Sequence, residues 1–228
     1  MLYTGIWGFG SWTTTFASAG MTNTTPVLIE KFGWDEDEAI LYNTTISSCA
    51  IVGLVIGGFV AGLLVPMGRR RTIFISMTLC MLGALISMIA HEVTLGLGRF
   101  VLGTGAAIFN IAISKSVLET IPGHISAPFA SSLGVSMAVG LIPVYALGAI
   151  LPDVEDKEAL KNDEMWRVIW LAPALIAIIV ILLTMTLIRQ EPILFCVSEN
   201  RDDEAIAHLK KVYRKAPGVT ESLDDILR

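Results

Sequence analysis

Six long apolar stretches alternate along the chain with shorter polar or charged segments. They cover residues 2–21, 41–65, 72–90, 94–116, 128–151 and 166–188. Each stretch has about the length that an α-helix needs to cross the roughly 30 Å hydrocarbon core of a bilayer. Because helices satisfy their own backbone groups in lipid, the pattern predicts an all-α membrane protein with six transmembrane helices.

The first stretch carries a stripe of hydroxyl side chains. Their spacing of three, four or seven residues places them on one face of a helix. Such a face either lines a watery cavity, or each hydroxyl bonds a carbonyl of its own preceding turn or a neighbouring helix. Both interpretations remain open for the stripe, which consists of Thr4, Ser11, Thr15, Ser18 and Thr22.

The second stretch is rich in glycine and ends in three arginines at residues 69–71. Gly53 and Gly57 form one pair four residues apart, and Gly58 and Gly62 form another. This spacing of small residues lets a second helix approach closely. The second stretch is therefore predicted to pack against a partner helix.

The stretches also fall into two sets of three. The first and fourth carry polar residues, the second and fifth are rich in small residues, and the third and sixth are the most uniformly apolar. An odd number of spans per set gives the sets opposite topology. The order therefore predicts a 3+3 inverted repeat, an arrangement common in transporters.

Composition and charge fix the setting and the orientation. Hydrophobic residues make up 54% of the 228 residues and charged residues only 16%, which excludes an ordinary soluble domain. Basic residues concentrate after the second and sixth stretches, whereas the connections at 23–40 and 152–164 are acidic. Because Lys and Arg beside spans stay on the inner face, a multi-pass protein with both ends cytoplasmic is predicted.

The last part of the chain differs from the rest. Residues 1–190 form the predicted six-helix bundle, and residues 191–228 form a charged segment on the cytoplasmic side. Asn200 can cap a helix there, with acidic residues in its first turn and basic residues in its last. We expect a cytoplasmic amphipathic helix in this linker, with an apolar stripe of Ile206, Leu209 and Tyr213.

Several short motifs identify a family. They are GRRR at 68–71, GRF at 98–100, Glu119 with Pro122, Trp166 with Arg167, and EPILFCVSENRDDEA at 191–205. In this order and spacing the chain resembles the N-terminal six-helix half of a major facilitator transporter of the sugar porter type. The resemblance implies a second six-helix half, in the same gene or as another chain, and a substrate cavity between the two halves. It also implies alternating access, with the first and fourth spans lining the cavity and the second and fifth facing the other half.

The chain departs from the family at its cytoplasmic gate, where charges latch the two halves together. The gate residues that remain are Arg69, Arg70, Glu119 and Glu191. Val65 stands where the motif has an aspartate, and Ser126 and Leu194 stand where it has arginines. The resemblance therefore implies a weakened or rewired latch.

The substrate site departs from the family as well. Trp12 stands where proton-coupled members carry an aspartate, and Gly134 stands where sugar porters carry a glutamine. An uncoupled facilitator is therefore expected. The predicted substrate-binding residues are Ser11, Trp12, Thr15, Ser18, Arg99, Asn110 and Gly134.

Arg99 is the most informative of these residues, because a charge inside a span costs several kcal/mol unless it is paired. Its predicted partners are the ring of Trp12 through a cation–π contact, the hydroxyls of the first span, or an anionic or polyhydroxyl substrate. The alternative is a structural arginine that binds backbone carbonyls.

These observations favour a transporter of a small polar solute, a sugar or polyol, that acts by facilitated diffusion in a lipid bilayer. The second hypothesis is a transporter-like protein that no longer transports and serves as an accessory subunit of a membrane complex. No loop clusters His, Cys or carboxylates at catalytic or metal-ligand spacing, so an enzyme is a distant third. We expect no metal, no cofactor and no nucleic-acid partner.

Overall fold

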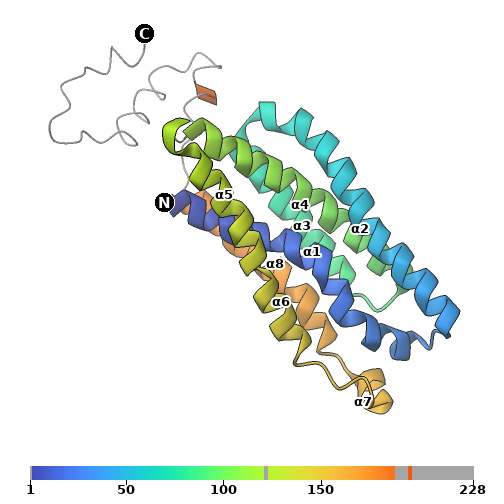
Figure 1. The fold of residues 1–228 in the computed structure, drawn as a ribbon. Coiled ribbons are helices and arrows are strands. Elements are labelled where there is room, and N and C mark those ends of the chain that lie inside the picture. Colours follow the sequence, from blue (N-terminus) through green and yellow to red (C-terminus); the bar gives the residue numbers. More distant parts are fainter. Residues whose placement is uncertain (1, 121–122, 188–194, 197–228) are drawn as a thin grey trace, which may run out of the picture.

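The computed structural model describes residues 2–120, 123–187 and 195–196, and every long element in this part of the chain is helical (Figure 1). The elements are α1 (Leu2–Phe32), α2 (Glu36–Leu64), the short 3-10 helix η1 (Val65–Met67), α3 (Arg69–Ser87), α4 (Glu92–Thr120), α5 (Gly123–Val139), α6 (Leu141–Gly148), α7 (Lys157–Asn162) and α8 (Trp166–Leu187). The predicted all-α class is confirmed. Glu191 and the predicted amphipathic helix at 200–214 lie outside the described residues.

Five helical segments of the described chain are long and apolar enough to cross a membrane. They are Glu36–Met67, Arg69–Ser87, Glu92–Glu119, Ser131–Gly148 and Trp166–Leu187. The remaining predicted span, the first, is α1, which has 31 residues but a high content of hydroxyl side chains. At 1.5 Å per residue α1 is roughly 46 Å long, so it exceeds the thickness of the hydrocarbon core.

The prediction of a loop over residues 23–40 is wrong, because helix occupies most of this segment. α1 continues to Phe32 and ends at Gly33, which has a positive φ of 68°. α2 then begins at Glu36, after Asp35 donates its backbone N–H to the Glu38 carboxylate at 3.4 Å. Acidic residues suit the first turn of a helix, where the macrodipole is positive. The acidic run is thus a helix start.

The predicted fifth span is divided into α5 and α6. Pro143 has no N–H to donate to the carbonyl of Val139, so the helical ladder is interrupted there. Trp12 packs at the same place, where a Cβ on Gly140 would lie 2.9 Å from the indole ring. The break therefore coincides with the contact between α1 and the α5–α6 segment.

α4 is the centre of the bundle and packs against both α2 and α3. Gly53 and Gly57 of α2 lie so close to α4 that a Cβ on either would collide with the carbonyl oxygen of Phe100 or Thr104. A Cβ on the other two glycines of the stripe would meet nothing within 4 Å. The predicted close helix approach is confirmed for one glycine pair, and the other pair faces outward.

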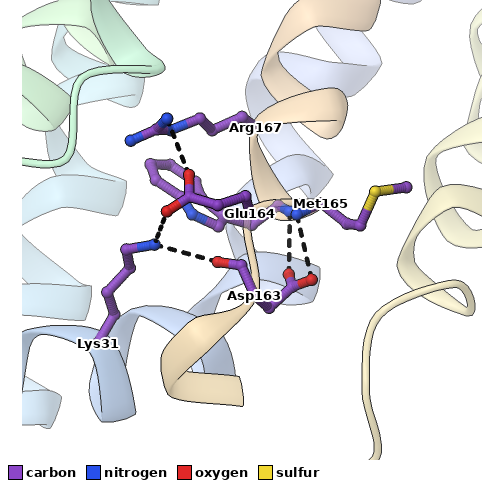
Figure 2. A network of polar contacts seen from close by, with 6 residues as sticks. Lys31, Asp163, Glu164, Met165 and Arg167 are labelled. Carbon is purple, nitrogen blue, oxygen red and sulfur yellow. Dashed lines mark hydrogen bonds and ion pairs between the residues drawn. The ribbon is translucent and has the colours of Figure 1, made fainter. Parts of the chain in front are cut away.

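A polar cluster fastens the long α1 to the start of α8 (Figure 2). Lys31 donates to Oε1 of Glu164 at 2.6 Å and to the carbonyl oxygen of Asp163 at 3.1 Å. Arg167 lies 2.8 Å from the other Glu164 oxygen. The hydrogen bond from Lys31 is the largest cause that lowers the pKa of Glu164. Trp166 is fully buried, with the Lys31 nitrogen 5.7 Å and the Arg167 guanidinium 5.6 Å from its ring centroid.

Candidate functional site

Arg99 lies deep in the bundle, where its side chain bridges neighbouring helices. Only 2% of the residue is exposed. Its Nε donates to the carbonyl of Ile46 in α2 at 3.2 Å, and its Nη2 donates to the carbonyl of Ala17 in α1 at 3.0 Å. The guanidinium carbon lies 5.2 Å from the ring centroid of Trp170 in α8. Arg99 therefore joins four helices.

The sequence suggested Trp12 as the aromatic partner of Arg99, and this expectation is wrong. The ring beside Arg99 is that of Trp170, whereas Trp12 packs against Gly140. Among the described residues no carboxylate pairs with Arg99. Its Nη1 is buried without a hydrogen-bond partner. The two carbonyl contacts match the alternative of a structural arginine. The guanidinium charge of Arg99 has no carboxylate partner among the described residues.

Asn110 occupies the same side of α4 and contacts α1. Its Nδ2 donates to the Thr14 hydroxyl oxygen at 2.6 Å and to the carbonyl of Ala106 at 3.0 Å. Ser18 in turn donates to the carbonyl of Thr14 at 3.0 Å. Asn110 is half-buried and Ser18 is exposed. Thr14 was missed by the spacing argument, although it lies one turn before Ser18.

The hydroxyl stripe divides into buried and exposed members. Ser11 is fully buried and donates to the carbonyl of Gly8 at 2.6 Å. Thr15 donates across to the carbonyl of Met137 in α5 at 3.0 Å. Ser18 and Thr22 are exposed, and the side chain of Thr4 is outside the described part. Ser11, Thr15 and Ser18 each donate to a carbonyl oxygen of the bundle, and Ser18 is the first of the three that is exposed.

Trp12 in α1 contacts the α5–α6 segment, and Gly134 lies in α5. Trp12 is half-buried, and its Nε1 donates to the Ser136 hydroxyl at 3.3 Å. Gly134 is exposed, and a Cβ there would meet nothing within 4 Å. The missing side chain at Gly134 therefore leaves open space beside α5.

Two predicted gate residues form an ion pair at the other end of the bundle. Arg69 donates through Nε and Nη2 to both oxygens of Glu119, at 2.8 and 2.5 Å, and the two side chains are only 13% and 16% exposed. Nη1 of Arg69 donates to the backbone carbonyl of Val65 at 3.1 Å. At Val65, where the family motif has an aspartate, the backbone carbonyl oxygen accepts this hydrogen bond. Arg70 follows in the first turn of α3.

Comparison with known proteins places the chain in a family. Residues 8–228 match the family model described as sugar (and other) transporter. Hexose transporter 1 of Toxoplasma gondii is 23% identical over 220 residues, which cover 90% of this chain and 39% of that protein. Hexose transporter 1 of Plasmodium falciparum is 23% identical over 214 residues, covering 88% of this chain and 42% of that protein. The chain spans about two fifths of the length of these relatives.

Solved structures show the same fold. The proton:xylose symporter XylE bound to 6-bromo-6-deoxy-D-glucose superimposes with a TM-score of 0.82 at 18% identity, over 92% of this chain and 49% of that chain. The partially occluded inward-open xylose transporter from E. coli gives a TM-score of 0.81 at 18% identity, over 92% and 52%. The bundle thus has the fold of one half of a major facilitator protein. Since the family model covers nearly the whole sequence, the chain belongs to the sugar (and other) transporter family.

Proposed function

We propose that the protein carries a sugar or polyol across a membrane by alternating access and facilitated diffusion. The observation that carries this proposal is the match of residues 8–228 to the sugar transporter family. Relatives named as hexose transporters, and the fold shared with a xylose transporter, support a sugar as the solute. They also favour transport over the accessory-subunit hypothesis, which none of these comparisons supports.

The proposed solute site lies along the accessible polar positions of α1, α4 and α5. Ser18 is exposed, and Trp12 and Asn110 are half-buried, so their polar groups are within reach of a solute. Sugar hydroxyls both donate and accept hydrogen bonds, which suits hydroxyl, amide and indole groups. Gly134 supports the proposal by leaving room for the solute. Arg99, Ser11 and Thr15 would shape the wall of the site from within the bundle.

A second six-helix half is part of the proposal, because the chain spans about two fifths of its relatives. Apolar side chains cover the outward faces of α2 and α6, such as Phe59 at 78% and Leu63 at 75% exposure. Gly58 and Gly62 lie open on the same helix as these residues. Faces of this kind fit either lipid or the helices of a second bundle.

The proposed orientation places both ends of the chain, and with them the end of the bundle that carries the arginines, on the cytoplasmic side. The start of α1, the end of α8 and the arginines that begin α3 lie at one end of the bundle (Figure 1). The acidic start of α2 and the helix α7 lie at the opposite end. Retention of basic residues on the inner face supports this orientation.

Uptake by the complete protein in liposomes tests the function. Labelled hexose should enter saturably, and unlabelled sugars should compete. Ser18→Ala should raise KM about two- to tenfold, the range expected for one lost hydrogen bond. Thr78→Ala is the matched control, because Thr78 is a partly exposed residue of α3 whose hydroxyl, like that of Ser18, bonds its own preceding turn. Absence of saturable flux across a panel of sugars and polyols would contradict the proposal.

A further inference from the structure

Arg69 has a third contact besides the Glu119 carboxylate and the Val65 carbonyl. Its guanidinium carbon lies 4.9 Å from the ring centroid of Phe195. A guanidinium is planar, so it can donate hydrogen bonds in its plane while an aromatic ring covers its face. Glu119 and Val65 accept the in-plane bonds, and Phe195 supplies the ring. The three contacts together leave the Arg69 side chain 13% exposed.

Phe195 comes from the linker that follows the bundle. It lies beyond the end of α8 at Leu187, and only 7% of the residue is exposed. Its neighbour Cys196 is also buried, at 2% exposure. The apolar side chain of Phe195, which belongs to a charged segment of the sequence, is thus buried beside the predicted gate residues. Because Arg69 and Phe195 are close, the burial is tied to the gate arginine.

Arg69 lies at a position where a cation needs stabilising contacts. It is the first residue of α3, where the positive end of the helix dipole disfavours a cation. The family motif would place an aspartate at Val65 and an arginine at Leu194. Neither charge is present, so the linker cannot be held at these positions by ion pairs. A ring over the guanidinium needs no charge on the linker.

We propose that Phe195 docks the linker onto the bundle through the face of Arg69. The gate surface formed by Arg69, Val65 and Glu119 accepts an aromatic side chain of this chain's own linker. Phe195 acts as a positioning residue that keeps residues 195–196 against the start of α3 and the end of α4. The gate surface of this half therefore combines one ion pair, Arg69–Glu119, with one cation–π contact.

Labelling of Cys196 measures the docking directly. The complete protein is placed in lipid nanodiscs, which expose both faces, and reacted with a water-soluble maleimide. Mass spectrometry then gives the labelling rate of each cysteine. Cys80 is fully buried in α3 and reports unfolding, because it stays unlabelled while the bundle is intact. The assay needs no solute, so its result does not depend on the proposed transport activity.

Four variants separate the cation–π contact from general packing. Phe195→Ala and Phe195→Leu should each speed labelling of Cys196 at least about fivefold, whereas Phe195→Trp should keep the slow rate because it retains a ring. Met67→Ala is the matched control, since Met67 is an exposed apolar residue beside the same gate. An unchanged rate in Phe195→Ala would overturn the docking. Protection by leucine equal to that by phenylalanine would overturn the role of the ring.

Discussion

Arg99 combines two roles that the sequence alone could not separate. Its bonds to the carbonyls of Ala17 and Ile46 join α1, α2 and α4, as expected for a structural brace. These carbonyls lie inside helices, whose own hydrogen bonds also use them. The charge itself has no carboxylate partner among the described residues. The two hydrogen bonds of Arg99 therefore stabilise the folded bundle, while the buried charge without a carboxylate partner destabilises it.

Substitution at Arg99 should reveal this balance. Arg99→Met removes the buried charge with a side chain of similar length, so the free energy of unfolding should stay within about 1 kcal/mol of the wild-type value. Arg99→Lys keeps a charge but loses the planar fork, so it should cost about 2–4 kcal/mol. Thermal unfolding in detergent measures both variants. A methionine variant less stable than the lysine variant would contradict the prediction and favour a purely structural arginine.

The burial of Arg99 within a span could be predicted from its position in the sequence, but its contacts could not. Trp170 belongs to α8, far away in the chain, and only the packing of α1 against both α4 and α8 brings the two side chains together. The same limit applies to the hydroxyl stripe. Helical spacing placed Ser11 and Ser18 on one face, yet burial within the bundle decided that only Ser18 is accessible.

At the scale of elements, the glycines of α2 show which face of a helix the bundle uses. Gly57→Ala should force α2 away from α4, where the added Cβ would meet the Thr104 carbonyl, at a cost of about 1–3 kcal/mol. Gly58→Ala is the matched control on the next residue, because its Cβ would enter open space. It should leave stability unchanged or raise it by up to about 1 kcal/mol through helix propensity.

Thermal unfolding of the two glycine variants side by side checks this prediction. Equal midpoints for Gly57→Ala and Gly58→Ala would show that α2 does not approach α4 as closely as the structure indicates. A loss of transport in Gly58→Ala at unchanged stability would support a second bundle on the open face of α2.

Helices were easier to predict than their ends. All six predicted stretches are helical, because a long apolar run in lipid must satisfy its own backbone groups, although α1 is not among the five segments apolar enough to qualify as spans. The hydropathy pattern failed at residues 23–40, where charged side chains lower hydropathy without ending the helix. Capping at Asp35 and the contacts of Lys31 with Glu164 stabilise helix beyond the apolar part. Pro143 and Gly140 in the fifth stretch marked a break that a hydropathy pattern does not detect.

At the scale of the whole molecule, the bundle is fastened at both ends. Lys31 and Glu164 join α1 to α8 at one end, and Arg69 and Glu119 join α3 to α4 at the other. α4 lies between these ties and packs along α2 and α3. These contacts favour motion of the bundle as one body, as the proposed alternating access requires.

The distribution of titratable groups in this body bears on energy coupling. Proton coupling needs a group inside the membrane that gains and loses a proton near neutral pH. In residues 2–120 and 123–187, the carboxylates of the long helices lie in first or last turns, such as Glu38 in α2 and Glu119 in α4. Among the described residues, Arg99 is the charged residue that lies buried in the bundle, and an arginine stays protonated across the physiological range. Trp12 stands where the family resemblance implies the acid of proton-coupled members, and an indole does not titrate near neutral pH.

Flux through the complete protein should therefore be independent of a proton gradient. In liposomes, the initial rate of sugar entry should be the same with and without an inward gradient of one pH unit, and internal sugar should never exceed the external concentration. External pH should not rise when sugar is added, because no proton enters with it. Liposomes with a proton-coupled xylose symporter provide the positive control. Accumulation that collapses with a protonophore would contradict the prediction and would place the coupling acid outside the described residues.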